Sequence, residues 1–288
     1  MKIIDTHIHF YDLDNKINSW IHRQANAPHL HKNHLPETLI HKSQAIICGI
    51  VHVEAHDSNI PTTVEIEWLA KIMQEVKNLP YRHIALADIT LPYAEFCNII
   101  HTISKYQAVV GIRHTFSFHR DFEYSPCNTD LSNHPNIAAN LKCLKDHNLI
   151  FACQGYPYQI NNLLLAIEQA GVTCILDHFA LPAWKSANDN EHKLWQETIL
   201  DLSKNPTIFL KLSGLDMFKS AAEFDDILDF CLDNFPPKQL LYGSNNPVSF
   251  KGDYNKWYNY LHNYFTNKKT GKETQEDIFL NSAAKLFF

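Results

Sequence analysis

Glycine is scarce in this sequence, with only 8 among 288 residues, and no glycine-rich fingerprint follows any of its apolar segments. Dinucleotide-binding folds carry such a fingerprint directly after a strand, so the sequence argues against that class. Long apolar runs are absent as well, because none approaches the roughly 20 residues that a membrane span requires. We therefore expect no membrane partner.

Clustered positive charge is also missing. The chain has 25 Lys and Arg against 31 Asp and Glu, a formal net charge of -6, and no basic block. Nucleic-acid binding needs grouped lysines and arginines at the phosphates, so we expect no nucleic-acid partner. A small anionic substrate needs only one or two local cations, and we expect a partner of that kind. A homodimer stays open.

The 7 cysteines are odd in number and scattered, without a Cys-x-x-Cys pair. Several lie in apolar segments, which favours reduced thiols in the core over disulfides or a zinc knot. The N-terminus has a single lysine, followed by charged and histidine residues where a signal peptide places its apolar core. We therefore expect a cytoplasmic protein.

The chain does contain a regular alternation of short apolar segments with amphipathic ones. After the N-terminal segment, the predicted strands are residues 45–54, 83–88, 108–114, 149–154, 172–178, 207–213 and 239–245. Strands that are apolar throughout are typical of a parallel sheet that is covered on both faces. About eight of them predict an α/β fold of the (β/α)8 TIM-barrel type, with residues 1–288 as a single domain.

The first strand carries Asp5, His7 and His9 at alternate positions. Successive side chains of a strand point to opposite faces, so these three are expected on one face. Two imidazoles at this spacing can bind one metal ion or one anionic substrate. The strand therefore predicts a site just beyond its end.

Polar side chains also end most of the other strands. In a barrel the C-terminal ends of the strands meet at one face, where catalytic residues collect. The residues at these ends are His7, His9, Glu54, Asp88, Arg113, His114, Gln154, His178, Ser213 and Asn245. A purely structural barrel would not need them. Two long connections, residues 11–36 and 116–135, are expected to form the wall or lid of the same site, including Phe116 to Asp121 and Tyr124.

Six motifs resemble, in their order, those of the amidohydrolase superfamily. More narrowly, they resemble the amidohydrolase-related branch that includes sugar lactonases and pyrone-dicarboxylate lactonase. They are Asp5-Thr6-His7-Ile8-His9, Val51-His52-Val53-Glu54-Ala55, Gly111-Ile112-Arg113-His114, Leu176-Asp177-His178, Lys211-Leu212-Ser213-Gly214 and Gly243-Ser244-Asn245-Asn246-Pro247. The resemblance implies a hydrolase that opens a lactone of a sugar acid or small carboxylate. It leaves open a metal-dependent decarboxylase of the same superfamily.

The resemblance also implies roles for individual residues. His7 and His9 would bind a metal ion or the substrate, and His178 would polarise the scissile carbonyl or complete the metal site. Arg113 would hold a carboxylate or hydroxyl of the substrate, which suits a guanidinium. Further candidates for substrate contacts are His52, His114 and Gln154.

Two positions depart from the family pattern. The fifth strand ends on Gln154, where binuclear members have a metal-binding histidine, so two metal ions are not expected. The eighth strand ends on Asn245, where the family usually has an aspartate as general base. An amide cannot abstract a proton from water.

Three alternatives follow from Asn245. One divalent metal ion, zinc by preference, would lower the pKa of its bound water; a metal-independent site is equally open. Another group, such as Glu54, Asp88 or His114, would act as the base while Asn245 orients the water. Otherwise the protein is a catalytically impaired homologue that only binds its ligand.

Overall fold

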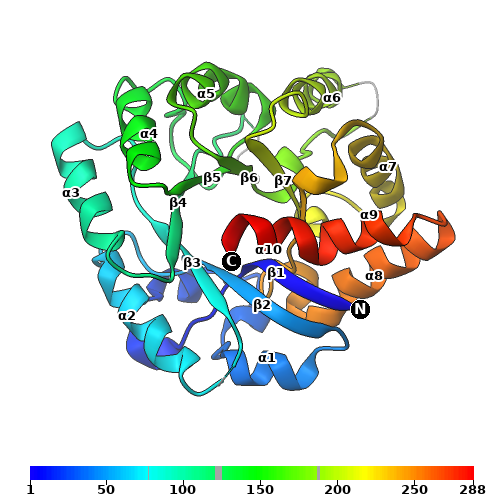
Figure 1. Cartoon of the computed structure of the whole chain (residues 1–288), viewed down its shortest axis with the longest axis horizontal. Helices are drawn as coiled ribbons and strands as arrows, with labels where there is room; N and C mark the ends of the chain where they lie inside the picture. Colours follow the sequence, from blue (N-terminus) through cyan, green and yellow to red (C-terminus); the bar gives the residue numbers. More distant parts are fainter. Residues whose placement is uncertain (77, 121–124, 187–188) are drawn as a thin grey trace.

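Eight parallel strands form one sheet in the order β1 to β8 (Figure 1). The computed structural model describes residues 1–76, 78–120, 125–186 and 189–288. The strands are β1 (Lys2–Ile8), β2 (Ile46–Val53), β3 (Tyr81–Leu86), β4 (Val109–Thr115), β5 (Ile150–Gln154), β6 (Cys174–Leu176), β7 (Ile208–Leu212) and β8 (Leu240–Tyr242). The prediction of an α/β fold of the (β/α)8 type is confirmed.

Helices alternate with the strands along the chain and surround the sheet (Figure 1). They are α1 (Pro36–Lys42), α2 (Thr62–Met73), α3 (Tyr93–Ile103), α4 (Ile137–Asp146), α5 (Pro157–Ala170), α6 (Asn190–Leu202), α7 (Phe224–Asn234), α8 (Tyr254–Asn267), α9 (Lys272–Glu276) and α10 (Ser282–Phe287). None of the helices in these described ranges is both long and apolar enough to cross a bilayer.

Backbone hydrogen bonds join the last strand to the first and nearly close the barrel. The Asn245 N–H donates to the His7 carbonyl at 2.7 Å, and the His9 N–H donates to the Asn246 carbonyl at 2.8 Å. Both bonds lie at the C-terminal ends of β1 and β8. The seam therefore brings the two N-terminal histidines next to Asn245, although about 240 residues separate them in sequence.

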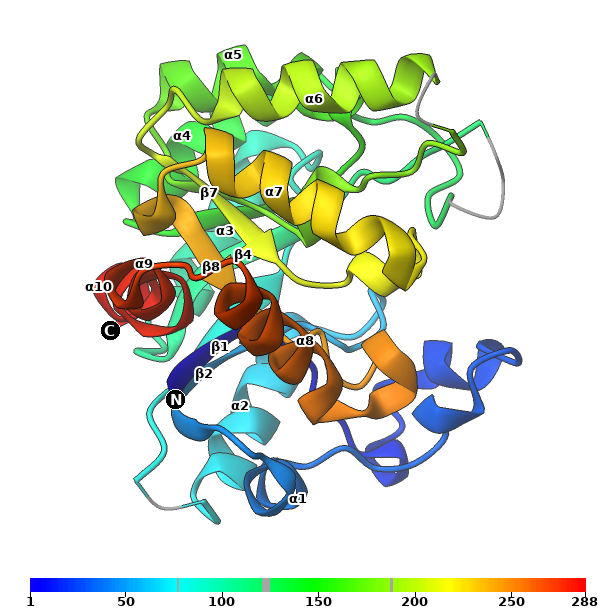
Figure 2. The same ribbon diagram turned by 90° about the vertical axis from the view of Figure 1, so that its right-hand side faces the viewer.

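One end of the barrel is filled and the other carries the long connections. Inward-facing residues of the strands, among them Ile4, Val51 and Ile175, cluster with Ala283 and Phe287 of α10. Helix α10 thus covers the N-terminal ends of the strands, while residues 11–35 lie at the opposite end (Figure 2). The open end is the C-terminal one, where a barrel places its working residues.

The alternation of side chains along β1 is interrupted. The pairing of β1 with β2 shifts between Asp5 and Ile8, as in a β-bulge. His7 and His9 face inward, but the Asp5 carboxylate accepts the Ser244 N–H at 2.9 Å and does not join them. The prediction that Asp5 shares a face with both histidines is therefore wrong.

Two of the cysteines also differ from expectation. Cys97 of α3 and Cys143 of α4 are paired as a disulfide, and their Cα atoms are 6.2 Å apart. The two helices pack side by side, so residues 46 positions apart in sequence meet. The other five cysteines are free, as the sequence predicted.

Gly111 of β4 has no room for a side chain. A Cβ atom there would lie 2.4 Å from the Ile150 carbonyl oxygen, in the backbone of the neighbouring strand. We expect Gly111→Ala to lower the free energy of unfolding by about 2 kcal/mol or more, as overpacking does when the neighbour cannot move. Gly155→Ala is the control, because its Cβ would meet only ordinary contacts of 3.6 Å or longer. Urea unfolding that finds both variants equally stable would contradict this packing.

Candidate active site

A cavity of about 950 Å³ opens at the C-terminal end of the barrel. Six of the residues predicted for the site or its surroundings lie in its wall: His9, Glu54, Arg113, Gln154, His178 and Asn245. They come from the ends of β1, β2, β4, β5, β6 and β8. The structure thus brings together side chains that span 237 positions of sequence, from residue 9 to residue 245.

The long connections complete the wall, as the sequence predicted. Trp20 and His29 line the cavity from the first connection, and Pro126 and Cys127 line it from the second. Phe116 does not, because its ring is 1% exposed and packs in the main core. Asp121 and Tyr124 lie outside the described residues.

The His9 ring is held in one orientation by two carbonyl groups. Its Nδ1 lies 3.0 Å from the Val53 oxygen and 3.1 Å from the Glu54 oxygen. A carbonyl can only accept, so Nδ1 carries the proton. Burial lowers the pKa of His9 to about 3, so the ring is neutral and Nε2 offers a lone pair.

The His7 ring lies beneath His9 and is fully buried. Its Nε2 is 3.1 Å from the His9 Nε2. Its Nδ1 is 3.3 Å from the Asp177 carboxylate and 3.3 Å from the Lys211 ammonium. Burial and the Lys211 charge hold the pKa of His7 well below its usual range, so this ring is neutral too.

These contacts allow two proton arrangements of His7. In the first, Lys211 donates to Nδ1, and the His7 Nε2–H donates to the lone pair of His9, which leaves no gap for a metal ion. In the second, Nδ1–H donates to Asp177, and Nε2 faces His9 as a second lone pair. Two lone pairs 3.1 Å apart repel unless a cation lies between them.

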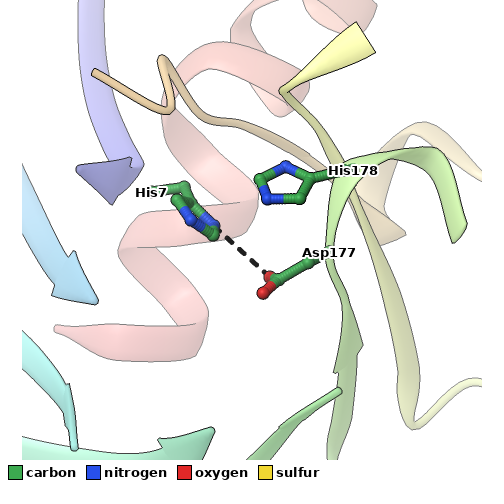
Figure 3. A group of neighbouring side chains, drawn as sticks. All are labelled: His7, Asp177 and His178. Atoms are coloured by element: carbon green, nitrogen blue, oxygen red, sulfur yellow. Dashed lines mark ion pairs between the residues drawn. The ribbon is translucent and has the colours of Figure 1, made fainter. Parts of the chain in front are cut away.

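The second arrangement fits a metal ion. Two imidazole nitrogens that share a tetrahedral ion at about 2.1 Å each lie about 3.4 Å apart, only slightly farther than the 3.1 Å between the two Nε2 atoms. His178 faces His7 with a ring-centroid separation of 4.5 Å, and donor atoms of His7, Asp177 and His178 all lie within 4.8 Å of one another (Figure 3). Asp177 then orients His7, as a carboxylate often does behind a ligating histidine. His7, His9 and His178 are the residues that would hold the ion.

Four buried charges surround these histidines and cancel. The Asp177 carboxylate lies 3.0 Å from the Lys211 ammonium and 3.5 Å from the Arg113 guanidinium. Burial alone would raise the pKa of Asp177, but Lys211 and His7 hold it well below its usual range. Arg113 also contacts Glu54 at 2.6 and 2.7 Å. Most of its donors are thus engaged within the protein, and its predicted contact with substrate stays a prediction.

His178 is positioned by an unusual backbone and by Ser213. Its φ angle is +54°, and its Nδ1 lies 2.9 Å from the Ser213 hydroxyl. Gly214, which follows Ser213 in the sequence, leaves room for the His178 ring. A Cβ atom at this position would lie 2.5 Å from the His178 Nδ1. Burial lowers the pKa of His178 to about 4, so it is neutral. A hydroxyl can donate or accept, so Nε2 can be a donor or a ligand.

Asn245 and Glu54 differ in what their side chains can do chemically. The Asn245 amide donates to the Ser249 hydroxyl at 2.9 Å and cannot serve as a base. Both short contacts from Arg113 end on one Glu54 oxygen, Oε1. Among the described residues nothing is seen to bind Oε2, and Glu54 is one of the residues that line the cavity.

Two predicted contacts with substrate need correction. His52 lies on the outer face of the sheet and bonds to the Phe10 carbonyl and to His83. His114 also faces outward, 3.5 Å from Asp88, because its neighbour Arg113 faces inward. These two histidines do not line the cavity. The alternation of side chains along β2 and β4 explains why both histidines face outward. Asp88 lies beside His114 and does not line the cavity either, so neither of these two residues is the base in this cavity.

Two buried residues of the site, Asp177 and Lys211, were not assigned a role from the sequence. Lys211 lies in the strand Ile208–Leu212, whose other residues are apolar. A lysine is almost never fully buried unless it is paired, so its position in an apolar strand was the available signal. Asp177 follows Ile175 by two positions and therefore shares its inward direction.

Comparisons with known proteins identify the family and the fold of the chain. The model of the protein family described as Amidohydrolase matches residues 4–288. No curated protein matches the chain. Solved structures do match over nearly the whole length.

Three of these structures illustrate the range. An amidohydrolase from Burkholderia multivorans with bound zinc has 18% identity and a TM-score of 0.79, with 100% of this chain and 99% of that chain covered. A protein from Pseudomonas putida assigned as a 2-pyrone-4,6-dicarboxylic acid hydrolase has 16% identity and a TM-score of 0.72, with 99% and 97% covered. A 2,6-dihydroxybenzoate decarboxylase in complex with 2,6-dihydroxybenzoate has 12% identity and a TM-score of 0.64, with 100% and 99% covered. At these identities the likeness shows the fold alone.

The metal site gives the first prediction for this cavity. We expect metal-free protein to bind one zinc ion per chain, and the double variant His7→Gln/His9→Gln to bind none. The control is His114→Gln, because His114 faces away from the cavity. Elemental analysis after dialysis measures the stoichiometry. Zinc retained by the double variant would contradict the assignment of the ligands.

Lys211 gives the second prediction. Its ammonium stabilises the His7 form whose Nε2 carries a proton, and it adds positive charge near the metal site. We therefore expect Lys211→Met to bind zinc about tenfold more tightly. Lys219→Met is the matched control, because Lys219 is a buried lysine that bonds to Trp184 and Glu223 outside the cavity. Competition with a chelator measures both affinities, and weaker binding by Lys211→Met would contradict this role.

Proposed function

Since the chain belongs to the amidohydrolase family, whose model matches residues 4–288, we propose that it is a hydrolase that opens lactones, with Glu54 as the general base. The observation that carries the proposal is the Glu54 carboxylate. Arg113 binds its Oε1 at 2.6 and 2.7 Å, Oε2 has no partner among the described residues, and Glu54 lines the cavity. A carboxylate oriented through one oxygen can accept a proton at the other.

The electrostatics suit this task. Burial raises the pKa of Glu54, and the Arg113 guanidinium opposes that shift. A raised pKa makes a carboxylate a stronger base, and the arginine beside it favours the ionised form that accepts a proton. Glu54 therefore supplies the titratable group that Asn245 lacks.

The reaction can be written with the residues of the cavity. A water molecule on Glu54 attacks the lactone carbonyl, and its proton passes to Oε2. When no metal ion occupies the Nε2 atom of His178, this neutral ring is held by Ser213 and donates from Nε2–H to the carbonyl oxygen as negative charge develops there. The bond from the carbonyl carbon to the ring oxygen then breaks, and the proton on Glu54 returns to that oxygen. The product is a hydroxy acid.

The charge of the cavity suggests which lactones it accepts. Lys211 and Arg113 are balanced by Glu54 and Asp177, so these buried charges favour a neutral lactone. A divalent metal ion held by His7, His9 and His178 would supply a Lewis acid and two positive charges, which favours a lactone with a carboxylate. The likeness to the Pseudomonas putida hydrolase and to the zinc-bound amidohydrolase supports lactone opening and a metal ion, respectively.

The proposal is tested by replacing the Glu54 carboxylate with an amide and the Asn245 amide with a carboxylate. We expect Glu54→Gln to lose about 100- to 10,000-fold in kcat on the best substrate of a lactone panel, as removal of a general base does. Asn245→Asp should restore about tenfold or more of that loss in the Glu54→Gln background, because it returns a carboxylate to the cavity wall. His114→Gln serves as the control with unchanged turnover.

Three results would contradict the proposal. Full activity of Glu54→Gln would exclude Glu54 as the base. Binding of lactones without turnover would make the protein a ligand-binding homologue. Release of carbon dioxide from hydroxybenzoates, without opening of any lactone, would make it a decarboxylase.

A further inference from the structure

Three histidines and one glutamate form a buried cluster that extends from the outer face of the sheet, at His52 and His83, to the cavity wall, where His56 lies. His52 of β2, His83 of β3 and Glu65 of α2 are each 0% exposed, and His56 follows β2. A glutamate is almost never buried without partners. The cluster therefore needs an explanation of its own.

The hydrogen bonds of the cluster have a definite direction. The His52 Nε2 lies 3.1 Å from the Phe10 carbonyl, so this nitrogen must carry the proton. The His52 Nδ1 is then a lone pair, which accepts the His83 Nδ1–H at 2.9 Å. Burial lowers the pKa of His83 to about 3, so its Nε2 is bare. A chain of donors thus runs from His83 through His52 to the Phe10 carbonyl, just beyond the end of β1.

Glu65 anchors the other half of the cluster. Its Oε1 accepts the Ala55 N–H at 2.7 Å, and its Oε2 accepts from the His56 Nδ1 at 3.0 Å. Burial would lower the pKa of His56, but Glu65 raises it. The carboxylate is therefore paired with the His56 ring, and both groups hold the segment after β2.

This cluster is not arranged as a metal site, although donor atoms of His52, Glu65 and His83 lie within 4.8 Å of one another. The two nitrogens of His83 face opposite neighbours. Nδ1 faces His52, and Nε2 faces Glu65 at 3.6 Å. The donors form a line and do not converge on one point, as the ligands of a metal ion must.

Both ends of the cluster reach backbone groups beside the active site. Phe10 directly follows His9, and Ala55 directly follows Glu54. His9 in turn donates to the Val53 and Glu54 carbonyls. The tails of β1 and β2 are thus bonded to each other from the cavity side by His9 and from the outer side by His52.

We propose that His52 is a positioning residue, which sets the orientation of the His9 ring through the hydrogen bond from its Nε2–H to the Phe10 carbonyl. The bond holds the backbone that follows His9, so the ring keeps Nδ1 on the two carbonyls and Nε2 toward His7. Glu65 does the same for Glu54 through Ala55. The catalytic consequence rests on the proposed function, but the orientation of His9 does not.

Two substitutions separate the nitrogens of His52. The amide nitrogen of His52→Gln reaches the position of Nε2 and can bond to Phe10. The shorter side chain of His52→Asn reaches only the position of Nδ1, so it can bond to His83 but not to Phe10. Both variants stay polar, which limits their effect on folding. A destabilising control is His147→Leu, which loses a 2.9 Å bond to the Cys143 carbonyl far from the cavity.

The measurement is nitrogen NMR of histidine-labelled protein, with thermal unfolding of each variant. We expect His9 to show the single Nδ1–H form in the wild type, in His52→Gln and in His147→Leu, and a mixture of both forms in His52→Asn. We also expect kcat on a lactone to fall roughly 10- to 100-fold in His52→Asn alone, the cost of a small misplacement. An unchanged His9 signal in His52→Asn would overturn the proposal. This holds whether or not the activity of His52→Asn is lost. Absent turnover in every variant, the wild type included, would count only against the proposed function.

Discussion

The buried carboxylate of Asp177 is the group on which the site depends. It lies between the Lys211 ammonium, the Arg113 guanidinium and the His7 ring, at 3.0 to 3.5 Å. Removing one member of such a cluster would leave an uncompensated charge in the core. The same carboxylate competes with Lys211 for the His7 ring. Asp177 and Lys211 therefore determine whether His7 binds a metal ion or donates a hydrogen bond to His9, although neither residue lines the cavity.

The sequence predicted the fold and the centre of the site well, because both follow from periodicity. Apolar strands with polar ends indicated the barrel, and the ends at His9, Glu54, Gln154 and His178 meet as expected. A strand has only two faces, and the C-terminal ends of parallel strands share one edge. No further information was needed to bring these residues together.

The remaining errors concern contacts that periodicity does not encode. The bulge in β1 separates Asp5 from the histidines, and no sequence signal marks it. The pairing of Arg113 with Glu54 depends on side-chain geometry across two strands. His114 differs, because an inward Arg113 already implied an outward neighbour. The sequence also contained a signal for Glu65, because this charged residue precedes the buried Ile66 in a helix that packs on the sheet.

The central claim, that Glu54 replaces the missing aspartate, is tested most directly by the pH dependence of kcat/KM in the wild-type protein. The reaction needs Glu54 ionised, and burial raises its pKa from the ordinary 4.5. As the pH falls, activity should therefore be lost through an apparent pKa above 4.5, and this limb should be absent from the residual rate of Glu54→Gln. A rate that stays constant down to pH values below 4.5 would contradict the account.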